Sequence, residues 1–389
     1  VFQVAGALLD EEVCTLEDVD RGARIGLRWA KGPFELMNKV GVGEALRMCE
    51  QLAELYDDLS PPKSITDQAN ANAPWSFRRV DITRSNGIAT IRLNRPEVMN
   101  ALDAELVGQL SERLDEALAT PGLRGIVIAG AGKAFVAGAD ISFFVRNIEA
   151  GTIGDIVTFT EAGQKLLRRI ETAPVPVVAR VHGMALGGGV ELALACHAIV
   201  ASPKASFTLP ETGIGIYPGL GGTQRLPRIV GAPLARRLIL TGRPLSAEAA
   251  KAAGLVLDVV PLGDLDDTIA SWLEKGLPDH YPSAPAGGDP ATLELYGTAF
   301  SRDLLQGHTP EGLSEAAQAL LEKDLRAIGR KAPVALAEAA RLIGEGAALD
   351  LEHALQLELD ALPGIFATSD ALTGLRSVSS REKPAWTGA

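Results

Sequence analysis

The chain has 389 residues, 47% of them hydrophobic and 22% charged, so it can bury more than one sizeable core. Its formal charge of −12 disfavours a nucleic-acid-binding surface, and its apolar runs are too short to span a membrane. Three scattered cysteines favour a reducing cytoplasm and exclude a disulfide framework. These features indicate a cytoplasmic globular protein of two or three domains.

Residues 1–58 have the pattern of a small helical domain. Thr15 begins a capping sequence, and apolar residues at helical spacing follow it. A second helix is expected to begin near Phe34, and a third to cover about residues 43–57. Three short helices make a small core, so this segment should pack against a neighbouring domain or a partner.

Residues 59–76 are rich in proline, alanine and polar side chains and lack apolar periodicity, which predicts a linker. From residue 77 onward, strand and helix patterns alternate. This alternation predicts an α/β domain. The expected strands lie at about residues 89–93, 125–129, 176–181 and 198–201, and the expected helices at about 102–114, 160–170 and 191–195.

After about residue 264 the helical pattern dominates. Residues 277–300 are rich in Pro, Gly, Ala and Ser and predict a loop-rich insertion. An apolar stripe over residues 313–325 then predicts another helix, and helices are expected to continue to about Leu362.

Two glycine-bearing turns stand where a strand is expected to lead into a helix, at residues 135–140 and 183–191. Small residues let a ligand approach the backbone, and the N–H groups at a helix N-terminus lack partners. Two such turns brought together could supply two N–H donors to one anionic oxygen. The simpler alternative is that the glycines only form tight turns.

Two acidic residues accompany these turns. Glu191 is expected in the first turn of a helix, and Glu211 follows twenty residues later. Taken singly, Glu191 would interact with the helix dipole and Glu211 would cap a loop. Together, two carboxylates beside an oxyanion site could hold a water molecule and transfer a proton.

Other kinds of site are excluded by motif. The sequence lacks a G-x-x-x-x-G-K-[ST] loop, a G-x-S-x-G elbow and an H-E-x-x-H pair. Its five histidines show no metal-ligand spacing, and the adjacent Cys196 and His197 would point to different faces of a helix or strand. No metal site is therefore expected.

Residues 77–389 resemble the enoyl-CoA hydratase/isomerase (crotonase) family. Four motifs occur in the family's order and spacing, at residues 94–102, 137–140, 187–191 and 210–226. The resemblance implies an α/β fold of repeated ββα units forming a superhelix with a helical C-terminal region. It also implies a homotrimer or a hexamer built from two trimers.

The resemblance assigns roles to individual residues. It makes the backbone N–H groups of Ala139 and Gly188 the oxyanion hole, and Glu191 and Glu211 the catalytic acids. It requires no metal or redox cofactor, since coenzyme A is part of the acyl-CoA substrate. The other residues that it places at the substrate are Ala137, Gly138, Asp140, Gly187, Tyr217, Pro218 and Arg381.

The implied reaction is the reversible hydration of a 2-enoyl-CoA to a 3-hydroxyacyl-CoA, as in fatty-acid β-oxidation. Isomerases of the family commonly lack one of the two acids, so the presence of both favours hydration. Isomerisation, another crotonase chemistry, and a non-catalytic assembly subunit remain alternatives. Phe143 and Phe144 stand near the position of a common family lysine and could shape an acyl pocket.

Residues 16–48 resemble the C-terminal helical domain of 3-hydroxyacyl-CoA dehydrogenases, through the motifs at residues 18–21 and 32–36. In that family a separate domain binds NAD. The start at Val1 then suggests an upstream NAD-binding domain, as in a dehydrogenase–hydratase fusion, and this chain alone should not oxidise a substrate. The alternative is a helical docking module without a catalytic role.

Overall fold

The computed structural model describes residues 1–278, 287–297 and 311–389. The chain divides into two compact units, Val1–Arg79 and Val80–Ala389. Each unit has a core of its own.

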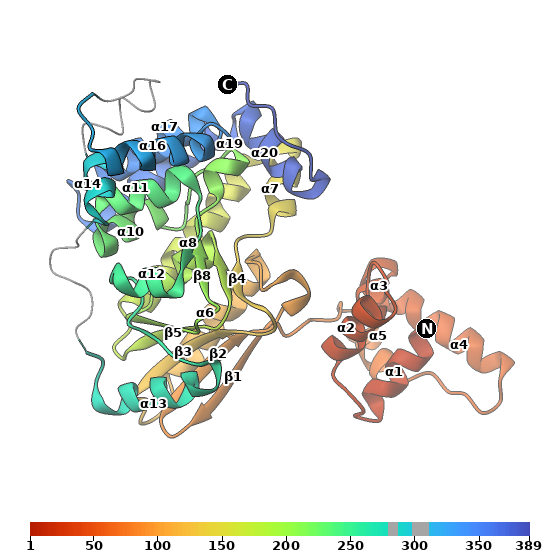
Figure 1. The fold of residues 1–389 in the computed structure, drawn as a ribbon. Helices are drawn as coiled ribbons and strands as arrows, with labels where there is room; N and C mark the ends of the chain where they lie inside the picture. Colours follow the sequence, from red (N-terminus) through yellow and green to blue (C-terminus); the bar gives the residue numbers. More distant parts are fainter. Residues whose placement is uncertain (279–286, 298–310) are drawn as a thin grey trace. The chain divides into compact units, whose positions relative to one another are not determined.

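Val1–Arg79 is entirely helical (Figure 1). Its core is formed by a few apolar side chains, among them Phe34 and Met37, and Trp75 packs edge-on against Phe34 with ring centroids 4.8 Å apart. The capping role of Thr15 is confirmed, because its side chain accepts the N–H of Asp18 at 3.2 Å. The helices of this unit are α1 (Phe2–Asp10), α2 (Leu16–Gly26), α3 (Pro33–Val40), α4 (Val42–Leu55) and α5 (Lys63–Asn70).

The prediction of a linker over residues 59–76 is wrong, since α5 lies within it. Ile65 of α5 is fully buried in the core of this unit, and Trp75 contacts the same core. Ile65 is surrounded in the sequence by polar and small residues, so the segment has no apolar periodicity that would predict a helix. The helix forms because it packs against other helices.

Val80–Ala389 contains two sheets. The larger has the order β1-β2-β3-β5-β7-β10, parallel except for the antiparallel pair β1–β2. Its strands are β1 (Val80–Ser85), β2 (Ile88–Leu93), β3 (Gly125–Gly130), β5 (Val177–Val181), β7 (Ala198–Ala201) and β10 (Asp258–Val259). The four strands expected from the sequence are all present as β2, β3, β5 and β7.

The smaller sheet has the order β4-β6-β8-β9, with β8–β9 antiparallel. Its strands are β4 (Ala134–Ala137), β6 (Met184–Leu186), β8 (Ser206–Thr208) and β9 (Leu245–Ser246). The pairs β3/β4, β5/β6 and β7/β8 each give one strand to the larger sheet and the next to the smaller. The chain therefore repeats a unit of two strands. Successive units pair their second strands in the smaller sheet, so the ends of these strands lie next to one another.

Helices cover the larger sheet on both faces (Figure 1). α13 (Leu265–Lys275) packs Leu265, Ile269 and Leu273 on one face of the sheet, against Val127 and Val178. The other face belongs to the main core, which α6, α8 and α9 complete. The helices between the strands are η1 (Pro96–Val98), α6 (Ala104–Leu118), α7 (Ile141–Ala150), α8 (Ile153–Glu171), α9 (Gly188–Leu194), η2 (Glu211–Ile214) and α12 (Ala247–Ala252), and η3 (Leu262–Asp264) precedes α13.

A further group of helices forms the layer at the top of Figure 1. The stripe at residues 313–325 corresponds to α16, and helices continue beyond Leu362 to Ser380. The prediction of a loop over residues 277–300 misses α14; residues 279–286 and 298–300 of that range lie outside the described residues. The helices of this layer are α10 (Gly222–Val230), α11 (Ala232–Thr241), α14 (Pro290–Tyr296), α16 (Glu315–Ile328), α17 (Pro333–Gly346), α18 (Leu351–Asp360), α19 (Leu362–Phe366) and α20 (Ser369–Ser380).

Candidate active site

The two glycine-bearing turns follow two neighbouring strands of the smaller sheet. The first leads from β4 into α7, and the second from β6 into α9. The sequence pattern instead suggested that they follow β3 and β5 directly, because β4 and β6 are too short to show an alternating pattern. Since β4 and β6 are parallel partners, both turns lie at the same edge of the sheet.

Within the described part of the chain, each turn leaves one backbone N–H group without an acceptor. In the first turn, the N–H of Leu102 donates to the carbonyl of Gly138, and the carbonyl of Leu102 accepts the N–H of Asp140, both at 2.8 Å. These two bonds involve the residues on either side of Ala139 but not the N–H of Ala139 itself. In the second, Gly188 is the first residue of α9, where an N–H has no partner within the helix. Within the described ranges, neither Ala139 nor Gly188 donates a backbone hydrogen bond.

The second turn requires glycine at position 187. Gly187 has φ +48° and ψ −120°, a backbone conformation that is strongly unfavourable for any residue with a Cβ atom. A Cβ atom there would lie 2.3 Å from Oε1 of Glu211. The missing side chain therefore lets the Glu211 carboxyl approach the backbone of the turn.

Glu191 is 2% exposed and lies in the first turn of α9. Its Oε1 accepts the N–H groups of Leu220 and Gly222, each at 2.7 Å. Burial raises the pKa of Glu191 to about 7, although these two N–H groups and the Arg225 guanidinium favour the ionised form. This carboxyl can therefore gain or lose a proton near neutral pH.

Glu211 begins η2 and is 7% exposed. Its Oε2 is buried and has no hydrogen-bond partner within the described residues. Burial raises its pKa well above the usual value, and repulsion from Glu191 adds to the effect, while the nearby Lys331 opposes it. These surroundings therefore favour the protonated form of Glu211 more than water would.

Both carboxyls and both turns line one cavity of about 310 Å³. Its other walls are mostly apolar. The residues that line it are Ala137, Gly138, Ala139, Ile141, Phe144, Phe159, Thr160, Leu186, Gly187, Gly188, Glu191, Pro210, Glu211, Ile214, Ile216, Tyr217, Gly219, Leu220, Leu362, Phe366 and Val378.

Three of the residues expected at the substrate do not line this cavity. Asp140 is the N-cap of α7, where its Oδ1 accepts the N–H of Ser142 at 3.0 Å. Pro218 is buried beside Tyr217, and Arg381 is exposed just after α20. The structure brings together the other four, Ala137, Gly138, Gly187 and Tyr217, with the two acids and the two N–H groups.

Sequence reasoning missed most of the apolar wall. Phe144 of α7 stacks on Phe366 of α19 with ring centroids 5.2 Å apart, and Phe159 of α8 packs edge-on against Phe144. Phe144 was singled out as a possible pocket residue, whereas Phe159 and Phe366 have the helical spacing of ordinary core residues. Only the packing of α7, α8 and α19 brings them together.

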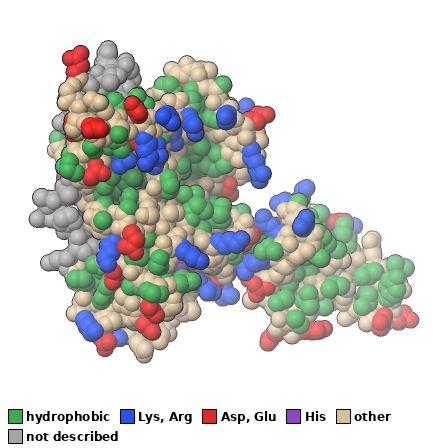
Figure 2. Space-filling model, in the orientation of Figure 1, with side chains coloured by type: hydrophobic (Ala, Val, Ile, Leu, Met, Phe, Trp, Pro, Cys, Tyr) green, Lys and Arg blue, Asp and Glu red, His purple; other side chains and the backbone are tan. Residues whose placement is uncertain are grey.

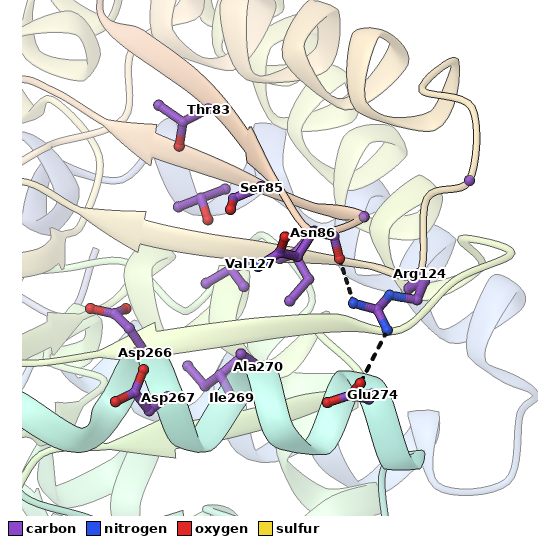
Figure 3. Close-up of a pocket in the computed structure, with 14 residues that line it drawn as sticks. Thr83, Ser85, Asn86, Arg124, Val127, Asp266, Asp267, Ile269, Ala270 and Glu274 are labelled. Atoms are coloured by element: carbon purple, nitrogen blue, oxygen red, sulfur yellow. Dashed lines mark hydrogen bonds and ion pairs between the residues drawn. The ribbon is translucent and has the colours of Figure 1, made fainter.

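A second hollow, of about 660 Å³, lies between the larger sheet and α13 (Figure 3). Asp266 and Asp267 lie at its rim, and Arg124 forms an ion pair with Glu274 at 3.7 Å. Asp266 is itself paired with Arg180. None of the residues expected at the site lines this hollow. Its acidic side chains are exposed, so it has no buried pair of carboxyls like that of the first cavity.

The part of the chain that the structure describes comprises residues 1–278, 287–297 and 311–389. In those ranges, no group of His, Cys, Asp and Glu side chains is placed to hold a metal ion. No helix there combines the length and apolar character needed to cross a membrane.

Two family models match the chain. Residues 83–283 match the model described as enoyl-CoA hydratase/isomerase, and residues 1–74 match that of the 3-hydroxyacyl-CoA dehydrogenase C-terminal domain. Both resemblances inferred from the sequence are thereby confirmed. The second match lies wholly within the helical unit Val1–Arg79.

Known proteins match in the same way. The chain is 32% identical to a crotonyl-CoA hydratase of Syntrophomonas wolfei, over 79% of this chain and 97% of that protein. It is 40% identical to the fatty acid oxidation complex subunit alpha of Shewanella putrefaciens, over 57% of this chain but only 31% of that relative's length. The structure of an enoyl-CoA hydratase from Rhodobacter sphaeroides superposes with a TM-score of 0.66 and 26% identity, covering 80% and 93% of the two chains. This superposition confirms the expected fold class.

Proposed function

Because this chain belongs to the enoyl-CoA hydratase/isomerase family, we propose that its unit Val80–Ala389 catalyses the reversible hydration of 2-enoyl-CoA to 3-hydroxyacyl-CoA. The observation that carries the proposal is the buried pair Glu191 and Glu211 in a cavity that also holds two N–H groups, for which the described residues offer no acceptor. Two buried acids with raised pKa values suit a reaction that needs both a base and an acid near neutral pH.

The oxyanion hole would act on the thioester carbonyl. The N–H groups of Ala139 and Gly188 belong to adjacent turns and line the cavity. Donating to one carbonyl oxygen, they would stabilise the negative charge that develops on it when a nucleophile adds at C3. The mostly apolar walls of the cavity strengthen this interaction, because charges and dipoles interact more strongly where the surroundings are less polar.

Glu191 and Glu211 would divide the proton transfers. The ionised Glu191 orients a water molecule and takes its proton as the water oxygen bonds to C3. The protonated Glu211 gives its proton to C2, which completes the addition of one water molecule. A proton passing back from Glu191 to Glu211 restores the starting state. This scheme uses only the two acids, the two N–H groups and water.

Coenzyme A is anionic, whereas the chain carries a formal charge of −12. On the face shown in Figure 2, Lys and Arg side chains gather over the upper, helical part of the larger unit. This local positive charge supports the binding of an anionic thioester. We keep Asp140, Pro218 and Arg381 in the proposed substrate site, although they do not line the cavity.

The wider setting belongs to the same proposal. The match of residues 1–74 supports a dehydrogenase partner with an NAD-binding domain, acting on the product of hydration in fatty-acid β-oxidation. A homotrimer or hexamer in the cytoplasm, without a metal or redox cofactor for the hydration step, completes it.

Crotonyl-CoA tests the proposal. Loss of the enoyl-thioester absorbance on adding the protein is the expected result. An intact protein that binds coenzyme A but leaves the spectrum unchanged would contradict hydration of this substrate. A 3-enoyl-CoA then separates the alternatives, because an isomerase would produce the absorbing 2-enoyl thioester and a non-catalytic subunit would not.

A further inference from the structure

A third buried carboxyl lies behind the two acids of the cavity. Glu358 of α18 is fully buried and is not among the residues that line the cavity. Its Oε1 accepts the N–H of Gly221 at 2.6 Å and Nε2 of Gln164 at 3.1 Å. Its Oε2 accepts the N–H of Thr223 at 3.2 Å and also the Thr223 hydroxyl. One side chain of the C-terminal helices therefore fixes the backbone at the start of α10.

The same stretch of backbone holds Glu191. The N–H groups of Leu220 and Gly222 both donate to Oε1 of Glu191. Four consecutive N–H groups, from residue 220 to residue 223, thus go alternately to Glu191 and Glu358. Any shift of this backbone moves the donors of both carboxyls together.

We propose that Glu358 is a positioning residue for Glu191. By fixing the backbone of residues 220–223, it keeps two N–H donors on Oε1 of Glu191 and leaves Oε2 as the oxygen that meets the water molecule. The inference rests on the proposed hydratase function, in which Glu191 activates that water.

The charges around Glu358 argue against a purely stabilising role. Burial raises the pKa of Glu358 to about 8, and repulsion from Glu191 adds to the effect, while Arg225 opposes it. Because burial and Glu191 oppose its ionisation, Glu358 lowers the free energy of unfolding as the pH rises above the usual range of a glutamate pKa, whereas a neutral side chain would not. Its distinctive contribution is geometric, because its two oxygens accept N–H groups on both sides of Gly222.

Steady-state kinetics of the whole chain with crotonyl-CoA test the inference. In Glu358→Gln the amide oxygen can accept one of the two N–H groups, but the amide nitrogen repels the other. We expect kcat to fall between about tenfold and about a hundredfold, since small displacements of a reacting group have effects of that order. We expect KM to change by less than about threefold, because Glu358 does not line the cavity.

A double-variant cycle separates positioning from general destabilisation. If Glu358 acts through Glu191, adding Glu358→Gln to Glu191→Gln changes kcat by less than about twofold. Thr223→Val, which removes the hydroxyl donor to Glu358, should show a smaller loss with the same non-additivity, and it serves if Glu358→Gln does not fold. Equal losses in both backgrounds, or wild-type kcat in the folded variants, would overturn the inference.

Asp324→Asn provides the matched control. Asp324 of α16 is also fully buried, and it is held by Arg237 and by the Tyr296 hydroxyl away from the cavity. Its variant should lose stability but keep kcat, and a loss of kcat equal to that of Glu358→Gln would count against positioning. An inactive wild-type chain would overturn the proposed function and this inference with it, whereas an active wild type with additive losses overturns this inference alone.

Discussion

Replacing Glu191 by glutamine should stabilise the folded protein at pH 8 while removing most of its hydratase activity. Burial raises the pKa of Glu191 from 4.5 to about 7, so the folded chain resists its ionisation. The amide has nearly the same shape, its oxygen can still accept the N–H groups of Leu220 and Gly222, and it carries no charge to bury.

The size of the effect follows from the pKa. One pKa unit corresponds to about 1.4 kcal/mol, so ionising Glu191 at pH 8 lowers the free energy of unfolding by about 3 kcal/mol. From pH 4.5 to 7 the unfolded chain has lost this proton and the folded chain retains it. Stability therefore falls as the pH rises through that window, and this cost is absent at lower pH.

Urea unfolding of the two proteins at pH 5 and pH 8, followed by circular dichroism, measures the difference. Glu191→Gln should exceed the wild type by about 3 kcal/mol at pH 8 and by under about 1 kcal/mol at pH 5. Its kcat for crotonyl-CoA should be at least about a hundredfold lower. Glu352→Gln, an exposed change on α18, is the control and should alter neither quantity. A stability difference that is absent, or equal at both pH values, would refute the reasoning.

Three further outcomes are expected. Glu211→Gln should lower kcat at least about a hundredfold, because the proton for C2 is lost, and near-full turnover of crotonyl-CoA would contradict that role. Phe144→Ala should raise the ratio of kcat/KM for longer over shorter enoyl-CoA chains, since it enlarges the cavity; an unchanged ratio would show that another wall limits the acyl chain. With a 3-hydroxyacyl-CoA and NAD, this chain should form no NADH, because residues 1–79 are helical and lack the strand–turn–helix that binds a dinucleotide, and detectable NADH would disprove this account.

The sequence predicts the acids and the turns because their geometry is local. In the second turn, the glycines and Glu191 lie within five consecutive residues, so the start of one helix places them all. Strand β6 before that turn has only three residues, and β4 before the first turn has only four. Segments of this length are too short to establish an alternating pattern, so the smaller sheet was not predicted even though its turns were.

The burial of Glu358 was not predicted, because the residues that bind its carboxyl are remote from it in the sequence. Its partners Gly221 and Thr223 lie more than a hundred residues earlier, and a glutamate in a helix usually faces solvent. One signal was present: Glu358 stands three and four residues after the buried Leu355 and Ala354, on the apolar face of α18. A charged residue in an apolar stripe requires a polar partner inside the protein, and here the partner is the start of α10.

The start of α10 explains how one site holds so many acids. Its N–H groups carry partial positive charge, and the buried Arg225 of the same helix adds a full one, with its Nη1 donating to the carbonyl of Leu220 at 3.0 Å. These charges favour ionisation of Glu191 and Glu358, but Arg225 and these N–H groups are not among the groups that lower the pKa of Glu211. The groups that lower the pKa of Glu211 are its own backbone N–H and the Lys331 ammonium, and its Oε2 has no hydrogen-bond partner within the described residues. The two acids of the cavity therefore lie in different surroundings, because of the two only Glu191 accepts N–H groups at the start of α10.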